Sequence, residues 1–178
     1  MELRRVTQNE YRYLKWIYDN AFPVEERAPF KRVWKCAAHG KADFLGIFVR
    51  ERCCGLVYLV EHGGIVYLFY FAVDPRVRGC GIGAKAIKEV LKRYKGKRLF
   101  LTLEQPDPKA ENYKTRLRRH AFYERCGLVD LPHKITEAGV VYAVMGTGEE
   151  IRPEEYRALM DYHMGKLMRM HLHMKMIG

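Results

Sequence analysis

Long hydrophobic runs are missing from this sequence. The longest, Ile65 to Val73, is far shorter than the roughly 20 apolar residues that cross a bilayer. An N-terminal signal, with a basic stretch followed by an apolar one, is also missing. These two absences argue against a membrane or secreted protein, and we expect a cytoplasmic protein that has no membrane partner.

Cysteines are few, and none stands in a metal-binding pattern. There are five, an odd number, and their spacings match no set of metal ligands. We interpret them as reduced thiols, mostly in the core, and expect Cys80 to pack beneath the loop that carries it. His171 and His173 do not alter the expectation of no metal site, because residues two apart on a helix do not face each other.

Acidic residues are scarce relative to basic ones. The chain has 32 Lys and Arg against 21 Asp and Glu, a formal net charge of +11. This surplus favours an anionic partner, such as a nucleic acid, an acidic membrane or a phosphorylated cofactor. A nucleic acid is disfavoured among these, because no stripe of exposed aromatic residues lies between the basic ones to stack bases.

Apolar residues are plentiful enough for one hydrophobic core. They make up 48% of the 178 residues, and no repeat, linker or low-complexity tract divides the chain. We therefore predict a single domain over residues 1–178, to which a C-terminal helix at about 153–176 is appended. Methionines on one stripe of that helix favour docking onto the sheet or a homodimer contact.

Hydrophobic periodicity and turn residues predict a mixed α/β order of elements. Thr7 and Glu10 form a capping box at the start of the first helix, and Gly127 ends the fourth. Three successive strands joined by short turns predict an antiparallel meander. Strands are expected at 3–6, 43–50, 53–61, 65–73, 98–103, 128–134 and 140–146, and helices at 7–22, 30–39, 83–94, 109–125 and 153–176.

A glycine-rich segment over residues 73–84 joins the strand expected at 65–73 to the helix expected at 83–94. Glycines let backbone N–H groups close around an anion, and the helix N-terminus adds unpaired donors and the positive end of its dipole. Arg76 and Arg78 add positive charge. The segment is therefore suited to a pyrophosphate.

Two phosphate-binding interpretations compete at this segment. Gly79, Gly81 and Ala84 also fit the dinucleotide fingerprint, and Glu104 ends the next strand where a ribose-binding acid would stand. Against that fingerprint, the preceding strands are joined by hairpin turns rather than by helices. A Walker-type loop is excluded, because no Gly-Lys-Ser/Thr follows the glycines.

A second motif lies at the end of the fourth helix, where Phe122 and Tyr123 precede Gly127 and Leu128. With this motif the sequence resembles the GNAT acetyltransferases. Their phosphate loop reads Arg/Gln-x-x-Gly-x-Gly/Ala, and their later helix ends in Phe-Tyr-x-x-x-Gly-Phe/Leu. The order of the elements from residue 3 to 146 is similar too. The resemblance implies a mixed, strongly twisted, mostly antiparallel sheet of about seven strands with helices on both faces.

The resemblance also implies acetyl-CoA as the acetyl donor and assigns residues to it. The pantetheine arm would lie along the strand end formed by Phe71, Ala72 and Val73. Tyr123 would protonate the departing thiolate. The pyrophosphate would be bound by the backbone of the loop that contains Arg78, Gly79, Cys80, Gly81, Ile82, Gly83 and Ala84.

One position departs from the family pattern. Arg116 stands seven residues before Tyr123, where the family commonly has an asparagine that contacts the pantetheine. Asn112, one helical turn earlier, is the candidate to replace it. The 3′-phosphate of CoA would meet a basic face made of Lys85, Lys88, Lys92, Lys114, Arg116 and Arg119.

Amine acetylation also needs a group that takes a proton from the attacking amine. Glu104 is the expected general base, acting directly or through a water. Glu25 and Glu26 lie where the family forms its acceptor entrance and would attract a cationic amine. The backbone N–H of Val73 would meet the oxyanion.

The expected activity is transfer of an acetyl group from acetyl-CoA to a primary amine of a small molecule or peptide. No nucleophilic serine or cysteine motif demands a covalent acetyl-enzyme, so direct attack in a ternary complex is the simpler route. The alternative is a non-catalytic module of the same fold that senses CoA or binds nucleic acid.

Overall fold

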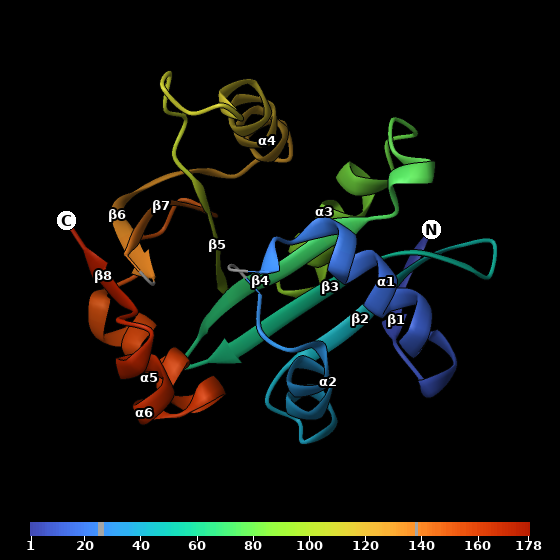
Figure 1. The fold of residues 1–178 in the computed structure, drawn as a ribbon, viewed down its shortest axis with the longest axis horizontal. Coiled ribbons are helices and arrows are strands. Elements are labelled where there is room, and N and C mark those ends of the chain that lie inside the picture. The colour runs from blue at the N-terminus through green and yellow to red at the C-terminus, as the bar shows by residue number, and fades with distance from the viewer. Residues whose placement is uncertain (25–26, 138) are drawn as a thin grey trace. The chain divides into compact units, whose positions relative to one another are not determined.

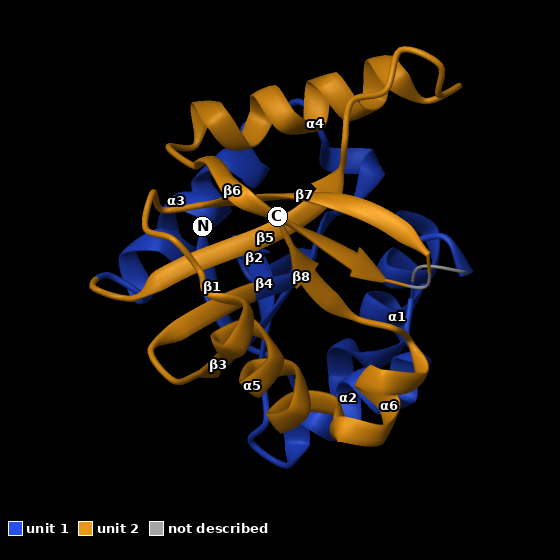
Figure 2. Cartoon of the chain, turned by 90° about the vertical axis from the view of Figure 1, so that its left-hand side faces the viewer, with its two compact units in different colours: residues 1–60, 68–95 blue, residues 61–67, 96–178 orange. Residues whose placement is uncertain are grey.

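A computed structural model of the chain describes residues 1–24, 27–137 and 139–178. Figure 1 shows the fold, and Figure 2 colours the two compact units into which its contacts divide the chain. Unit 1 comprises residues 1–60 and 68–95, and unit 2 comprises residues 61–67 and 96–178. The single acetyltransferase domain over residues 1–178 stays a prediction.

Unit 1 is built on a sheet whose strands are rich in aromatic and β-branched residues. β1 (Glu2–Arg5) pairs with β2 (Asp43–Val49), and β2 pairs with β3 (Arg52–His62), both antiparallel. β4 (Ile65–Val73) follows β3 after a two-residue turn, and its second half belongs to this unit. β2, β3 and β4 are buried along nearly their whole length, as continuous apolar runs require.

Helices cover this sheet through regularly spaced apolar residues. The capping box at Thr7 and Glu10 is confirmed, and it opens a 3-10 turn that leads into α1 (Tyr11–Ala21). α2 (Phe30–Ala38) packs against β2, and α3 (Ile82–Arg93) packs against β1. In Figure 1, α1 and α2 lie toward the viewer and α3 lies behind.

Unit 2 contains the other strands. The first residues of β4 run parallel to β5 (Arg98–Glu104), which pairs antiparallel with β7 (Val140–Gly146). β7 pairs antiparallel with β6 (Val129–Glu137), and β6 with β8 (Lys175–Ile177). The helices of this unit are α4 (Tyr113–Arg125), α5 (Pro153–Met164) and α6 (Lys166–His171). The expected mixed, mostly antiparallel α/β sheet is confirmed, with eight strands instead of about seven.

The continuous C-terminal helix expected over 153–176 was wrong. Gly165 has a φ of 86°, which ends α5, and α6 is only a short second helix. Beyond it Met174 and Met176 are buried while Lys175 is exposed, the two-residue period of a strand. This segment is β8, which accounts for the eighth strand.

α4 begins later than expected. Its start was predicted at residue 109, but the backbone N–H of Lys109 donates to the Asp107 carboxylate (2.9 Å) and that of Ala110 to the Asp107 carbonyl (2.9 Å). This local turn competes with the helix until Tyr113. Among the described residues, no helix combines the length and the apolar character that a membrane span requires.

Candidate functional site

The glycine-rich loop of unit 1 leaves a helix N-terminus uncovered. β4 ends at Val73, a 3-10 turn (Pro75–Val77) follows, and α3 begins at Ile82. Gly79 and Gly81 have φ values of 84° and 71°, a left-handed conformation that glycine adopts without strain. Gly81 provides no side-chain cap, so the N–H groups of the first turn of α3 have no acceptor within the helix. These donors suit an anion.

The two arginines of the loop have different partners. The Arg76 guanidinium pairs with the Asp74 carboxylate (Nη2 to Oδ2, 2.9 Å), so its charge is already matched. Arg78 is exposed, and its Nε donates to the Val73 carbonyl (3.3 Å). Cys80 is exposed as well, so the expectation that it packs beneath the loop was wrong. Its neighbours Gly79 and Gly81 are exposed too, so this part of the loop lies at the surface.

The end of β4 carries the residues expected along the pantetheine arm. The ladder between β4 and β5 is recorded over Ile65–Tyr67 and Arg98–Phe100, and Phe71, Ala72 and Val73 come after it. Ala72 is buried, while Phe71 and Val73 are partly exposed. On β3, a Cβ added at Gly55 would lie 2.4 Å from the Ala72 carbonyl oxygen. Sequence reasoning missed this glycine, which permits the close approach of the β3 and β4 backbones.

Tyr123 stands in the last turn of α4, where a Schellman motif ends the helix. Gly127, with a φ of 93°, donates to the Glu124 carbonyl (2.9 Å), and Leu128 donates to the Tyr123 carbonyl (3.1 Å). Leu128 is buried, as the hydrophobic contact of this motif requires. The glycine and leucine of the sequence motif therefore have a structural role, which is to fix the helix end beside Tyr123.

The Tyr123 side chain itself is largely buried, at 9% exposed. Burial raises the pKa of Tyr123 above its ordinary value, and the positive charge of Arg119 opposes this shift only in part. The structure records no hydrogen bond from its hydroxyl to any described residue. The phenol is therefore protonated at neutral pH and has a proton to donate.

Glu104 lies in an ion-pair network at the end of β5. Arg116 contacts its carboxylate at 2.6 Å and Arg119 at 3.7 Å, and Asn112 Nδ2 donates to it at 3.4 Å. Arg116 also donates to Asn112 Oδ1 (2.6 Å) and to the Gln105 carbonyl (3.0 Å). The arginine that replaces the family asparagine thus holds the strand end and the helix start together.

The site residues expected from the sequence fall into two groups that are each described within one unit. The strand end and the phosphate loop belong to unit 1, whereas Glu104, Asn112 and Tyr123 belong to unit 2. Glu25 and Glu26 lie outside the described residues. Where the structure describes the chain, no three His, Cys, Asp or Glu side chains are grouped to hold a metal ion.

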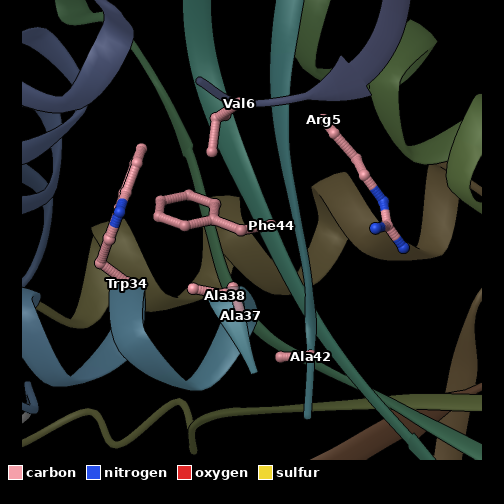
Figure 3. Close-up of a pocket in the computed structure, with 7 residues that line it drawn as sticks. All are labelled: Arg5, Val6, Trp34, Ala37, Ala38, Ala42 and Phe44. Carbon is pink, nitrogen blue, oxygen red and sulfur yellow. The ribbon is translucent and has the colours of Figure 1, made fainter. Parts of the chain in front are cut away.

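A separate cavity of about 220 Å³ lies in unit 1, away from these residues. Figure 3 shows Val6, Trp34 and Phe44 gathered on one side of it, with Arg5 apart from them. Its walls are mainly apolar, and none of the expected site residues lines it. The lining residues are Arg5, Val6, Trp34, Ala37, Ala38, Ala42 and Phe44.

Comparison with known proteins identifies the family to which the chain belongs. The acetyltransferase (GNAT) family model matches residues 11–128, more than half of the chain. The chain belongs to the GNAT acetyltransferase family. The match includes the end of β4, the glycine-rich loop and the Schellman motif after Tyr123.

Solved structures resemble the chain at low sequence identity. A GNAT-family protein from Bacteroides thetaiotaomicron, described as an acetyltransferase, is 20% identical with a TM-score of 0.72, and the match covers 97% of this chain and 96% of that one. A spermidine N-acetyltransferase from Vibrio cholerae is 19% identical (TM-score 0.62; 82% and 94% covered). The ribosomal-protein-S18-alanine N-acetyltransferase from Escherichia coli is 14% identical (TM-score 0.61; 86% and 96% covered). No curated protein matches the sequence. At these identities the likeness establishes the fold alone.

Proposed function

We propose that this protein transfers the acetyl group of acetyl-CoA to a primary amine of a small molecule or peptide. The observation that carries the proposal is the N-terminus of α3, which has no side-chain cap and follows two glycines in the left-handed conformation. Membership of the GNAT family supports the choice of acetyl-CoA over other phosphorylated ligands. A GNAT structure of an aminoglycoside 6′-N-acetyltransferase is complexed with coenzyme A, which supports the same donor.

In this proposal the backbone of unit 1 binds the donor. The N–H groups of the loop residues Arg78 to Ala84 bind the pyrophosphate, and the helix dipole of α3 adds to that attraction. The backbone of Phe71 to Val73 pairs with the amides of the pantetheine arm. Because peptide groups make these contacts, loop conformation determines donor affinity more than side-chain identity does.

The chemical step in this proposal is direct attack. The amine nitrogen forms a bond to the thioester carbonyl carbon, the carbonyl oxygen becomes an oxyanion near the Val73 N–H, and the carbon–sulfur bond then breaks. The nitrogen loses one proton and the sulfur gains one, so the products are an amide and CoA. Holding both reactants in one complex supplies much of the rate enhancement.

Tyr123 and Glu104 are the proposed proton donor and acceptor. The raised pKa of Tyr123 makes complete transfer of its proton to the thiolate uphill, so its larger contribution is a hydrogen bond to sulfur in the transition state. The Glu104 carboxylate is paired with Arg116 (2.6 Å) and Arg119 (3.7 Å). In this proposal Glu104 takes the proton of the attacking amine, directly or through a water.

The acceptor is proposed only as a class. Similar folds include proteins described as acting on spermidine, on aminoglycosides and on a ribosomal-protein alanine, which are all amines. Glu25 and Glu26 remain the proposed attraction for a cationic amine. The cytoplasmic location and the homodimer also remain predictions.

Titration calorimetry tests the donor first. Purified protein is titrated with acetyl-CoA and, separately, with NADH. Saturable binding of acetyl-CoA alone supports the proposal and justifies a screen of amines by release of the CoA thiol. Binding of NADH without acetyl-CoA overturns it and restores the dinucleotide interpretation.

A further inference from the structure

Asp74 stands out among the described residues as a charged side chain with no exposure, at 0%. It directly follows β4, and its backbone N–H donates to the Cys54 carbonyl on β3 (2.8 Å). Its carboxylate accepts from the Arg76 backbone N–H (2.9 Å), which caps the 3-10 turn before the phosphate loop. One buried side chain therefore holds the strand end and the loop start together.

Two further side chains complete this arrangement. The Tyr13 hydroxyl on α1 donates to Asp74, and the Arg76 guanidinium donates to Asp74 through Nε (3.1 Å) and Nη2 (2.9 Å). Arg76 Nη2 also contacts the Tyr13 oxygen at 3.2 Å. We call these three residues the loop anchor. All three lie in unit 1, and they tie α1 to the end of β4.

Aromatic rings fix the outer side of the loop anchor. The Arg76 guanidinium lies 4.7 Å from the centre of the Trp16 ring and 5.6 Å from that of Tyr13, and the two rings are stacked. Arg76 is thus held on one side by a carboxylate and on the other by aromatic faces. These contacts hold the guanidinium against Asp74, while the Arg76 side chain as a whole is 56% exposed.

We propose that Tyr13, Asp74 and Arg76 are positioning residues that hold the phosphate loop in its anion-binding conformation, and that Arg76 itself is not a phosphate ligand. This inference rests on the proposed function, since it concerns the same donor site. Only four residues separate Asp74 from Gly79, so a shift of the anchored turn moves the loop N–H groups directly. Preorganised donors bind an anion without a further ordering cost.

The salt dependence of binding distinguishes a positioning residue from a residue that contacts the phosphate directly. A cation that contacts a bound phosphate makes binding weaken with salt, and removing the cation lowers that salt dependence. A positioning residue changes the affinity at every salt concentration by the same factor. Replacing Arg76 by lysine keeps the charge but loses the bidentate contact with Asp74, because lysine lacks the planar fork of donors.

The experiment measures acetyl-CoA affinity over a range of salt concentrations for Tyr13→Phe, Asp74→Asn, Arg76→Lys and Arg76→Ala. Tyr11→Phe on the same helix is the matched control, since Tyr11 contacts Phe30 and Trp34 and not the loop anchor. We expect affinity to fall about tenfold for Asp74→Asn and Arg76→Lys, about threefold for Tyr13→Phe, and not at all for the control. The slope against salt should equal that of the wild type for Tyr13→Phe, Arg76→Lys and Arg76→Ala.

Pantetheine as competing ligand gives the second readout. It lacks the pyrophosphate, so the variants should lose much less affinity for it than for acetyl-CoA, whereas a generally destabilised protein would lose both ligands alike. Equal acetyl-CoA affinity in all variants would overturn the inference, and so would a reduced salt slope for Arg76→Ala. If the wild type itself binds no acetyl-CoA, the proposed function fails first. Should Asp74→Asn not fold, Tyr13→Phe and Arg76→Lys still decide the outcome.

Discussion

Removing the Tyr123 hydroxyl tests the chemical role of this side chain without removing the ring that packs in the core. Tyr123→Phe keeps the buried ring and removes only the oxygen, so we expect little change in KM for acetyl-CoA. We expect kcat to fall about 100-fold, the usual contribution of one positioned acid. Steady-state kinetics with an acceptor found by the amine screen makes the measurement.

Tyr113→Phe, on the same helix, is the control for this substitution and should leave kcat unchanged. Because burial raises the pKa of Tyr123, kcat should also show no loss from tyrosine ionisation up to about pH 10. An unaltered kcat in Tyr123→Phe would assign Tyr123 to the core alone.

Cys80 offers a chemical probe of the phosphate loop. Its thiol is exposed, while Cys53, Cys54 and Cys126 are buried, and burial raises the pKa of Cys53 to about 11. N-ethylmaleimide should therefore modify Cys80 before these three and block acetyl-CoA binding by filling the loop. Acetyl-CoA should protect Cys80, which mass spectrometry of the labelled peptide measures.

Cys80→Ser is the control for the labelling, because it should bind acetyl-CoA normally and keep that binding after treatment. Cys36 is partly exposed and reports non-specific labelling. If acetyl-CoA leaves the labelling rate of Cys80 unchanged, the loop does not hold the donor.

Residues differ in how far the sequence predicts them. Gly79, Gly81 and Tyr123 could be proposed from the sequence because they stand in short motifs whose physical purpose is local. Tyr13 and Gly55 could not, because their purpose depends on partners far away in the chain: Tyr13 donates to Asp74, 61 residues later. A contact of that kind leaves no periodic or spacing signal.

At the scale of elements, the end of α4 is open to a direct test. Gly127 has a φ of 93°, so Gly127→Ala places a Cβ in the left-handed region and should lower the free energy of unfolding by about 1 to 2 kcal/mol. Nothing lies within 4 Å of the added Cβ, so the cost is backbone strain and not a clash. Urea unfolding measures it.

Gly127→Asn is the matched control, since asparagine tolerates the left-handed conformation better than alanine and should cost less. A loss in Gly127→Ala no larger than in Gly127→Asn would contradict the Schellman account of this motif.

Elements were predicted well where periodicity and turns agree. The bounds of β4 and β7 match the prediction, because each is an apolar run closed by a turn at both ends. The C-terminal segment could not be predicted, because its methionines fall on a helix stripe and methionine is a good helix former. Its conformation depends on Gly165 adopting a positive φ and on pairing with β6, of which only the first leaves a trace in the sequence.

At the scale of the whole molecule, the described part of each unit has a buried or nearly buried carboxylate whose pKa is lowered by hydrogen bonds from arginine. Hydrogen bonds from Arg76 hold the pKa of Asp74 in unit 1 well below its usual range. Hydrogen bonds from Arg98 and Arg152 hold the pKa of Glu155 in unit 2 well below its usual range. Because both groups are protonated more readily in the unfolded chain, acid should favour unfolding of both units.

The direction of the two pKa shifts determines how the free energy of unfolding should change with pH. Each folded pKa lies below the unfolded value of about 4, so the stabilisation is complete above that value and is lost as pH falls toward the folded pKa. The free energy of unfolding should therefore stay level from pH 7 to about 5 and decline steeply below about 4.5. Urea unfolding at a series of pH values measures the profile.

Substitutions in the two units identify the carboxylates responsible. Asp74→Asn and Glu155→Gln should each lower stability at pH 7, since an arginine loses its charged partner, and each should flatten the decline in acid. Glu149→Gln is the control: Glu149 is exposed, so the acid decline should remain as in the wild type. If the decline keeps its full slope in the Asp74→Asn and Glu155→Gln double variant, other carboxylates cause it. If it flattens in the double variant more than in either single one, the two units lose stability in acid through separate ion pairs.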